Sequence, residues 1–240
     1  RVSDGDSFRA VSREGDLEVR LLGVNSPEAD ECFGEESTER LRSLLGSGAV
    51  SIGPWPGETD PFGRTLAMVR AGSNFVNLDL VESGHAVARA QSDHGFEQEF
   101  EAAEERASEA RLGLWADDAC GKPNDATIVI ARVEADAPGD DRENPNGEWV
   151  LIRNDDDRIV DLAGWVVRDE STRHRYEFGE LTLEPGASVR LRSGCGADDP
   201  SSDPLDLYWC DPEPPIWNNA GDTAFLLDQN GNIADYRQND

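Results

Sequence analysis

The pattern of apolar residues changes near residue 125, and this change constrains the fold more than any other feature. Before it, apolar residues recur at helical spacing in three stretches, EESTERLRSLLGSG, NFVNLDLVESG and GFEQEFEAAEERASEARLGLW. From residue 127 onward, short strand-like runs such as TIVIARV, EWVLIRN and SVRLRS alternate with turn-rich stretches. A chain of 240 residues also exceeds the usual size of one domain. The sequence therefore predicts two domains, 1–122 and 127–240, joined by a linker at 123–126.

The order of elements predicts a different fold class for each domain. In the first, we expect strands at 7–12 and 17–24, a helix ending at Gly46, and strands at AVSIG and RTLAMVRA around a loop, PWPGETDPFG. With the two further helices, this order is typical of an α+β fold. The second domain, with short strands and no helical pattern, is typical of an all-β sandwich.

Charge limits how this chain can meet nucleic acid. Lys and Arg number 22 against 50 Asp and Glu, a net charge of −28, and Lys122 is the only lysine. Such a surface repels nucleic acid at long range, so a nucleic-acid function would depend on a few local arginines. From residue 123 onward, 10 basic and 26 acidic residues argue against direct DNA binding. Adaptation to high salt and a G+C-rich genome are alternative explanations of this composition.

The cysteines suggest an oxidising compartment. Cys32 and Cys120 lie near the two ends of the first domain, and Cys195 and Cys210 lie 15 residues apart in the second. We expect the disulfides 32–120 and 195–210, one per domain, as in exported proteins. Buried free thiols are an alternative, and zinc is disfavoured because the chain has no C-x-x-C.

The sequence also predicts a location outside the cytoplasm. No apolar run approaches the ~20 residues of a transmembrane helix. The first expected strand begins close to residue 1, which is consistent with a leader peptide upstream. We therefore expect a secreted or cell-envelope protein.

Two carboxylates flank a glycine in DGDS, at Asp4 and Asp6. A solvated polar turn is one interpretation. A cation site is the other, because hard cations prefer carboxylate oxygens. If the chain is extended there, the two side chains project from the same face of a strand.

Five sequence motifs, DGDS among them, decide between these two interpretations. DGDS at 4–7, VRLLGVNSPE at 19–28, DPFGR at 60–64, VNLDLVESG at 76–84 and LGLW at 112–115 follow one another at characteristic spacing. Together they resemble the thermonuclease (staphylococcal nuclease-like) family over nearly the whole first domain. The resemblance implies an OB-fold barrel of five strands with three helices. It also implies Ca²⁺-dependent hydrolysis of phosphodiester bonds in DNA and RNA.

The resemblance assigns the metal site residue by residue. Asp6 matches a metal-binding aspartate, and Asp4 adds negative charge beside it. Asn25 stands where the family often has a second metal-binding aspartate. Ser26 matches a residue whose backbone carbonyl binds the metal. An asparagine oxygen is still a ligand that calcium accepts, so we expect weaker metal binding rather than its loss.

The resemblance also assigns the catalytic residues. Glu28 matches the general base or orienter of the attacking water, and Arg20 and Arg64 match two arginines that bind the phosphate. Phe62 stands where a substrate-binding tyrosine is found, so a hydroxyl is lost. Three further departures are Pro61 in place of a lysine, and Ala90 and Ser92 in place of two tyrosines.

The second domain resembles a lamin-tail domain. The matching words are GEWVLIRNDDDRIVDLAGWVVRDE, LEPGASVRL and WNNAGDTAFLLDQNGNIAD. The resemblance implies an immunoglobulin-like sandwich that acts as an adaptor, and we expect its partner to be a protein or cell-envelope component rather than DNA. The sequence thus predicts a secreted, monomeric, Ca²⁺-dependent nuclease with an accessory anchoring domain. The alternative is a catalytically weak or inactive nuclease-like binding or scaffold protein of the cell envelope.

Overall fold

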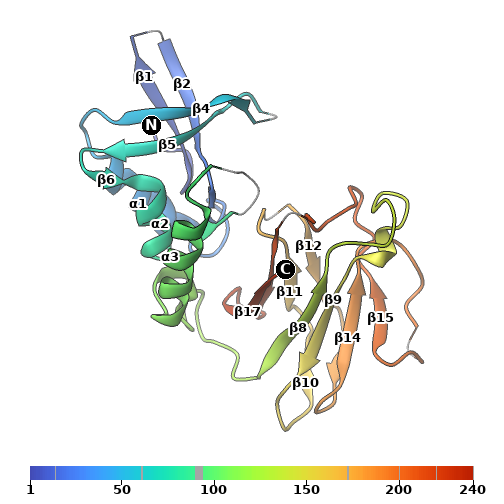
Figure 1. Ribbon diagram of the computed structural model, residues 1–240. Helices are drawn as coiled ribbons and strands as arrows, with labels where there is room; N and C mark the ends of the chain where they lie inside the picture. Colours follow the sequence, from blue (N-terminus) through green and yellow to red (C-terminus); the bar gives the residue numbers. More distant parts are fainter. Residues whose placement is uncertain are drawn as a thin grey trace. The chain divides into compact units, whose positions relative to one another are not determined.

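The chain divides into two compact units, Arg1–Cys120 and Gly121–Asp240 (Figure 1). This computed structural model describes residues 1–13, 15–60, 62–89, 94–171, 173–199, 201–219 and 221–239, without the side chains of 54–58. The predicted linker at 123–126 lies just after the point where the two units divide.

The first unit mixes strands with three α-helices, as an α+β fold requires. Its elements are β1 (Ser7–Ser12), β2 (Gly15–Leu21), β3 (Val24–Asn25), α1 (Gly34–Leu45), β4 (Ser51–Thr59), β5 (Thr65–Ala71), β6 (Asn74–Phe75), α2 (Val76–Glu82), β7 (Val87–Ala88), α3 (Glu97–Glu109) and a 3₁₀ turn at Gly113–Trp115. Each of the three predicted helices is present.

Strand pairing in the first unit sets up the site described below. The main sheet has the order β1-β2-β5-β4, with β6 also paired to β5, and β2 runs parallel to β5. Ser7 pairs with Arg20 across β1 and β2, and Asn25 pairs with Val87 across the small β3–β7 ladder. The core between sheet and helices is built from apolar side chains that include Val19, Leu21, Leu41, Val69, Leu80 and Phe100.

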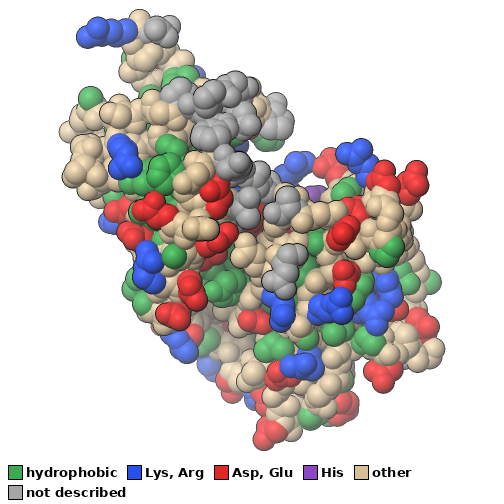
Figure 2. Space-filling model, in the orientation of Figure 1, with side chains coloured by type: hydrophobic (Ala, Val, Ile, Leu, Met, Phe, Trp, Pro, Cys, Tyr) green, Lys and Arg blue, Asp and Glu red, His purple; other side chains and the backbone are tan. Residues whose placement is uncertain are grey.

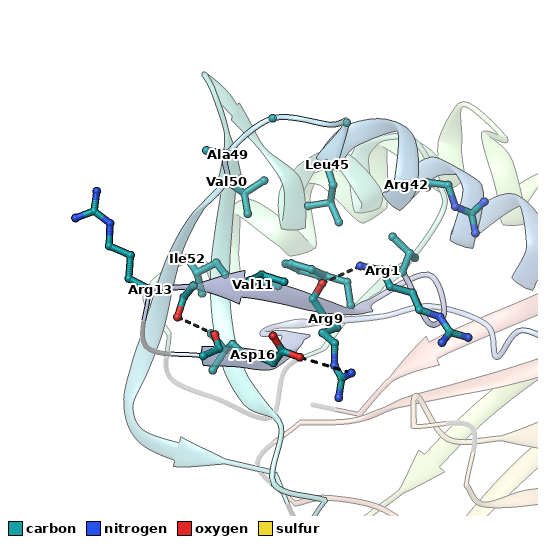
Figure 3. A pocket seen from close by; sticks show the side chains of 18 residues that line it. Arg1, Arg9, Val11, Arg13, Asp16, Arg42, Leu45, Ala49, Val50 and Ile52 are labelled. Atoms are coloured by element: carbon teal, nitrogen blue, oxygen red, sulfur yellow. Dashed lines mark hydrogen bonds and ion pairs between the residues drawn. The ribbon is translucent and has the colours of Figure 1, made fainter.

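The closed barrel implied by the resemblance is not found among the described residues. There the ladder of strands is open, with β1 and β4 at its two ends. A cavity of about 1410 Å³ lies between the β1–β2 hairpin, the end of α1 and the start of β4 (Figure 3). Along it, the amino group of Arg1 donates to the Arg9 carbonyl at 2.8 Å, and Arg9 N donates to the Arg1 carbonyl at 2.7 Å.

The predicted loop at PWPGETDPFG is wrong in its first half, because β4 continues from Ser51 to Thr59. The proline-containing segment is tolerated because, among the described strands, β4 ends the ladder and pairs with β5 alone. Its register shifts between Pro54 and Thr59. Prolines, which have no N–H to donate, are accommodated at edges and bulges of this kind.

The second unit contains strands and one 3₁₀ turn in its described part. Its elements are β8 (Ile128–Glu134), a 3₁₀ turn at Pro145–Gly147, β9 (Trp149–Asn154), β10 (Val160–Asp161), β11 (Val166–Arg168), β12 (Arg175–Glu177), β13 (Thr182–Leu183), β14 (Ser188–Arg192), β15 (Leu205–Tyr208), β16 (Thr223–Leu227) and β17 (Ile233–Gln238).

Two four-stranded sheets form this unit, one ordered β15-β14-β9-β8 and the other β12-β11-β16-β17. Strands of both sheets contribute alternate apolar residues to one core, and its largest buried side chains are Trp165 and Trp217. The outward residues of β9 and β14 are partly exposed, as alternation predicts for a sandwich.

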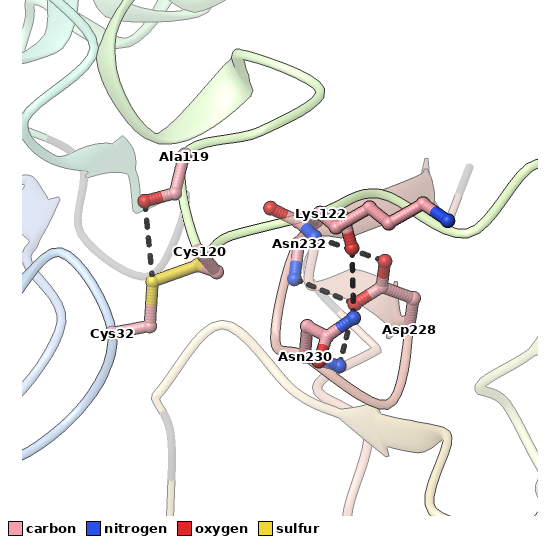
Figure 4. The surroundings of a disulfide bond; sticks show 7 residues. All are labelled: Cys32, Ala119, Cys120, Lys122, Asp228, Asn230 and Asn232. Atoms are coloured by element: carbon pink, nitrogen blue, oxygen red, sulfur yellow. Dashed lines mark hydrogen bonds between the residues drawn. A yellow bond between two sulfur atoms is a disulfide. The ribbon is translucent and has the colours of Figure 1, made fainter.

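Each unit holds one disulfide, Cys32–Cys120 and Cys195–Cys210, and no cysteine is free. Figure 4 shows Cys32 and Cys120 and, in the second unit, the carbonyl of Lys122 accepting a hydrogen bond from Asn230 Nδ2 at 2.8 Å. The second unit therefore begins before the linker predicted from sequence. None of the described helices is long and apolar enough to cross a bilayer.

The second unit buries an acid, Glu148, just before β9. Its side chain is 0 % exposed, and its Oε2 accepts a hydrogen bond from Ile216 N at 3.1 Å. Burial raises the pKa of Glu148 to about 7, despite that hydrogen bond. The charged form is therefore disfavoured in the folded protein relative to the unfolded chain.

We expect the two units to fold independently, because each has its own core and its own disulfide. The fragments 1–120 and 121–240, expressed separately under oxidising conditions, should each show a cooperative thermal transition by circular dichroism. Their summed spectra should reproduce the spectrum of the whole chain. A fragment that is unfolded alone but folded in the whole chain would contradict this division.

The stability of the second unit should fall as pH rises through neutrality. The pKa of Glu148 is higher in the folded state, so its proton stabilises the fold below about pH 4.5, and this stabilisation is lost as pH rises through about 7. At about 1.4 kcal/mol per pKa unit, the loss amounts to about 3 kcal/mol. Glu148→Gln should flatten the dependence of unfolding free energy on pH between 5 and 8, measured by denaturant titration. Glu184→Gln, at an exposed position, is the matched control, and an unchanged slope in Glu148→Gln would refute the assignment.

Candidate active site

The DGDS sequence forms a tight bend before β1, which corrects the expectation of an extended segment with Asp4 and Asp6 on one face. Asp4 Oδ1 accepts a hydrogen bond from Asp6 N at 3.0 Å and so closes the turn. Gly5 is required by close approach, because a Cβ there would lie 2.6 Å from the Cβ of Ser37 and 2.7 Å from that of Ser26. Asp4 thus shapes the bend that presents Asp6.

Asp6 is the centre of the site. It is 5 % exposed, and its Oδ2 accepts hydrogen bonds from Ser26 N at 2.8 Å and Ser26 Oγ at 3.1 Å. Arg20 Nη2 lies 3.0 Å from the same oxygen. Asp6 Oδ1 accepts a hydrogen bond from Ser7 Oγ at 2.9 Å. The turn at the start of the chain is thereby joined to the NSPE segment twenty residues later.

Arg20 lies on β2 and is nearly as buried as Asp6. Its Nη1 donates to the carbonyls of Leu21 at 2.9 Å and Val24 at 2.8 Å, and its Nη2 donates to Asn25 Oδ1 at 2.6 Å. Burial lowers the pKa of Arg20, and the charge of Asp6 opposes that shift. One guanidinium therefore fixes both the aspartate and the asparagine predicted to bind metal.

Arg64, the last residue of DPFGR, also reaches the hydrogen-bond network of Asp6. Its Nη1 donates to Ser7 Oγ at 2.9 Å, and its Nε donates to Asp60 Oδ2 at 2.5 Å. Its side chain is 31 % exposed, so the guanidinium remains accessible from solvent. The two predicted arginines thus approach Asp6 from β2 and from the loop before β5, and Arg20 is the more buried of the two.

Sequence reasoning missed two residues of this network, Ser7 and Asp60. Ser7 Oγ bridges Asp6 and Arg64, and Asp60 Oδ1 accepts hydrogen bonds from the backbone N of Phe62 and Arg64, both at 2.9 Å. Burial alone would raise the pKa of Asp60, but hydrogen bonds from Arg64 lower it. The spacing of Asp60 and Arg64 around a glycine turn was the available signal.

Glu28 lies at the exposed edge of the site. Its carbonyl accepts a hydrogen bond from Glu31 N at 2.9 Å, and the first residue of α1 packs on this turn. That residue is Gly34, where a Cβ would come within 3.1 Å of Ala29 Cα and still closer to the Glu28 carbonyl. Partial burial and the charges of Asp6 and Asp4 raise the pKa of Glu28. A raised pKa suits a proton acceptor that works near neutrality.

Phe62 is 80 % exposed at the tip of its loop, and the Arg64 guanidinium lies 5.6 Å from its ring centroid. A ring in this position can contact a base or sugar beside the arginine. The other predicted departures, Pro61, Ala90 and Ser92, lie outside the described residues.

The oxygen atoms at and around Asp6 are suitable ligands for a hard cation. Asp6, Asn25 and Ser26 offer only oxygen ligands, which calcium prefers. In the described part of the chain, Asp6 Oδ1 accepts a single hydrogen bond, and a carboxylate oxygen has capacity for about two. Among the described residues, no three acidic, histidine or cysteine side chains form a ligand cluster. A bound cation here would therefore depend on neutral oxygens as well as on Asp6.

Each half of the chain matches a known family model. Residues 18–117 match the family model described as Staphylococcal nuclease homologue, and residues 122–239 match the model described as Lamin Tail Domain. The first match contains Arg20, Asn25, Ser26, Glu28 and Arg64, and it begins after Asp6.

Curated proteins named as nucleases are similar to about half of this chain. An uncharacterized endonuclease of Haemophilus influenzae is 32% identical over 118 residues, which are 49% of this chain and 64% of that protein, less than two thirds of its length. A micrococcal nuclease of Shigella flexneri is 28% identical over 51% of this chain and 75% of its own. A thermonuclease of Staphylococcus hyicus is 27% identical over 48% and 73%. The chain therefore combines a domain of the staphylococcal nuclease family with a lamin tail domain.

Proposed function

We propose that this protein is a Ca²⁺-dependent nuclease that hydrolyses phosphodiester bonds of DNA or RNA. One observation carries the proposal: three separate segments, DGDS, VRLLGVNSPE and DPFGR, meet in a continuous network that runs Asp60–Arg64–Ser7–Asp6–Arg20–Asn25. A solvated turn at Asp4 and Asp6 would need no such network. The relatives named as nucleases support the same function.

Asp6, Asn25 and the Ser26 backbone would hold the calcium ion, and Asp4 and Glu28 add negative charge nearby. When bound, the ion would neutralise phosphate charge. Arg64, whose side chain is 31% exposed, binds the scissile phosphate through its fork of N–H donors and stabilises the charge that builds up in the transition state. Arg20 orients Asp6 and Asn25 and adds a buried positive charge beside the two residues.

Glu28 accepts a proton from the attacking water. Its side chain is exposed at the rim of the site, and its raised pKa makes it a stronger base than an ordinary glutamate. Phe62 contacts the substrate beside Arg64, without the hydrogen bond a tyrosine would add. Base affinity is therefore expected to be modest, because stacking alone contributes ~1–3 kcal/mol per base.

The two disulfides support a secreted or cell-envelope location, since such bonds persist in oxidising compartments. The lamin tail domain then serves as an accessory binding module for the nuclease. The second candidate is a nuclease-like binding protein without activity. It is favoured by Asn25, which lacks a charge, and by Arg20, whose Nη1 and Nη2 donate to protein acceptors.

Asn25→Asp should lower the calcium concentration needed for half-maximal cleavage. Restoring a carboxylate adds one negative charge at a ligand position and strengthens the site, with a smaller effect on the rate at saturation. A calcium titration of cleavage on a fluorescent oligonucleotide measures both values. If the wild-type protein is folded but inactive at every calcium concentration, and Asn25→Asp restores cleavage, the binding-protein candidate is correct.

Glu28→Gln and Arg64→Ala should each lower the rate at saturating calcium by on the order of 10²-fold or more. The first removes the proton acceptor, and the second removes transition-state stabilisation. Glu36→Gln and Arg13→Ala, both at exposed positions away from the network, are the matched controls. Rates within twofold of wild type for Glu28→Gln and Arg64→Ala would refute these roles.

A further inference from the structure

The outer face of the β8-β9-β14-β15 sheet carries a regular grid of arginine and apolar side chains. Across the ladders, Trp149 pairs with Arg192, and Leu151 pairs with both Arg190 and Arg132. Arg153 follows on the same side of β9, because side chains alternate along a strand. The residues between them, Val150 and Ile152, are buried in the core. We call this set the arginine face; it consists of Arg132, Arg153, Arg190, Arg192, Trp149 and Leu151.

Trp149 makes cation–π contacts with two of these arginines. The guanidinium carbons of Arg132 and Arg190 lie 5.2 Å and 5.3 Å from its ring centroids. Cation–π contacts of this kind hold a guanidinium in place without using its N–H donors. Figure 2 shows Lys and Arg side chains gathered with apolar ones over the part of the second unit where Figure 1 shows β8, β9 and β14.

The charge of this face differs from that of the unit around it. The second unit has 11 basic and 26 acidic residues. Four of its arginines lie on the arginine face, and the carboxylates that pair with them are Glu134, Asp155 and Asp206. The face therefore carries four arginines against three carboxylates paired with them, whereas the unit as a whole is strongly acidic.

Donors remain for a ligand. In the described part of the chain, Arg132 donates to Glu134 alone, and a guanidinium has five N–H groups. The side chains of Arg132 and Arg153 are 62% and 45% exposed. At one end of the face, a cavity of about 440 Å³ is lined by Trp149 and Arg192, by the amides Asn144 and Asn146, and by Glu134 and Asp136. Amides and arginines in a hollow beside a tryptophan are groups that hydrogen-bond base edges.

We propose that the arginine face binds single-stranded nucleic acid and so holds the substrate of the nuclease domain; this rests on the proposed function. Arginines bind phosphates through their donors and unpaired bases through their planes, whereas a duplex keeps its base faces stacked inside. A four-stranded sheet is only about 15 Å wide, which suits a few nucleotides. The net charge of this domain argued against DNA binding. That charge is a sum over the whole domain, and it does not give the local charge of the arginine face.

The test is binding of a fluorescein-labelled oligothymidine strand by the full chain in EDTA, followed by fluorescence anisotropy at several salt concentrations. The variant is Arg132→Glu with Arg153→Glu. Its matched control is Arg158→Glu with Arg173→Glu, which makes the same charge change at exposed arginines of the same unit outside the face. Thermal melts check that both variants fold. If the charge-reversed face does not fold, Arg132→Gln with Arg153→Gln replaces it.

We expect the face variant to raise Kd about tenfold and to reduce the slope of log affinity against log salt by about 1, while the control stays within about twofold of wild type. A duplex of the same length should bind more weakly than the single strand. Equal losses in both variants, no loss in the face variant, or no binding by wild type at low salt would each overturn the proposal. Tighter binding of the duplex would overturn the preference for single strands.

The same preparations separate this inference from the proposed function. Cleavage of the oligonucleotide in calcium tests whether the nuclease domain is active, and anisotropy in EDTA tests the arginine face without cleavage. If cleavage is absent but binding still depends on the arginine face, the proposed function fails and the face remains a nucleic-acid site. If cleavage is normal and binding ignores the face, only the inference fails.

Discussion

The buried ion pair between Asp6 and Arg20 holds the candidate site together. Both side chains are less than a tenth exposed, and their charged atoms lie 3.0 Å apart. Burying two charges costs free energy that their attraction offsets only when further hydrogen bonds satisfy both groups. Ser7 and Ser26 supply those bonds to Asp6, and backbone carbonyls supply them to Arg20. Removing one partner would leave an unpaired buried charge, at a cost of about 3–5 kcal/mol.

This pair also determines what position 25 contributes. Arg20 neutralises the charge of Asp6 and donates a hydrogen bond to the oxygen of Asn25. These three side chains together therefore carry almost no net charge. The negative field that would attract a cation then comes mainly from Asp4 and Glu28, whose pKa values are raised by burial and by the charge of Asp6. Under the proposed function, position 25 would set how strongly a cation is held, while the hydrogen bonds to Asp6 and Asn25 keep their oxygens in place.

The sequence predicted the three helices, the two-domain division and most long strands, because each rests on local periodicity. It did not predict β15 or β17, whose short runs have weak alternation, nor the continuation of β4 through two prolines, which depends on that strand's place at the end of the ladder. In the site, the sequence analysis named Asp6, Arg20 and Arg64 because the motifs single them out, and the structure joins the three in one network. Ser7 was missed because its role arises from a side-chain hydrogen bond with Arg64, 57 residues away, and no local pattern encodes that contact. Asp60 was missed although its spacing from Arg64 around a glycine turn is a local signal.

Charge shows the same limit of sequence reasoning. A net charge of −28 is a correct statement about the field far from the molecule, where contributions average. At contact distance the arrangement decides, because screening shortens the range of each charge to about 8–10 Å at physiological salt. Arg190 and Arg192 are two residues apart, so alternation alone places them on one face of β14. That Arg132 joins them depends on β9 lying between β8 and β14, and that order of strands is a tertiary fact. An acidic chain can thus gather a basic surface wherever pairing aligns its few arginines.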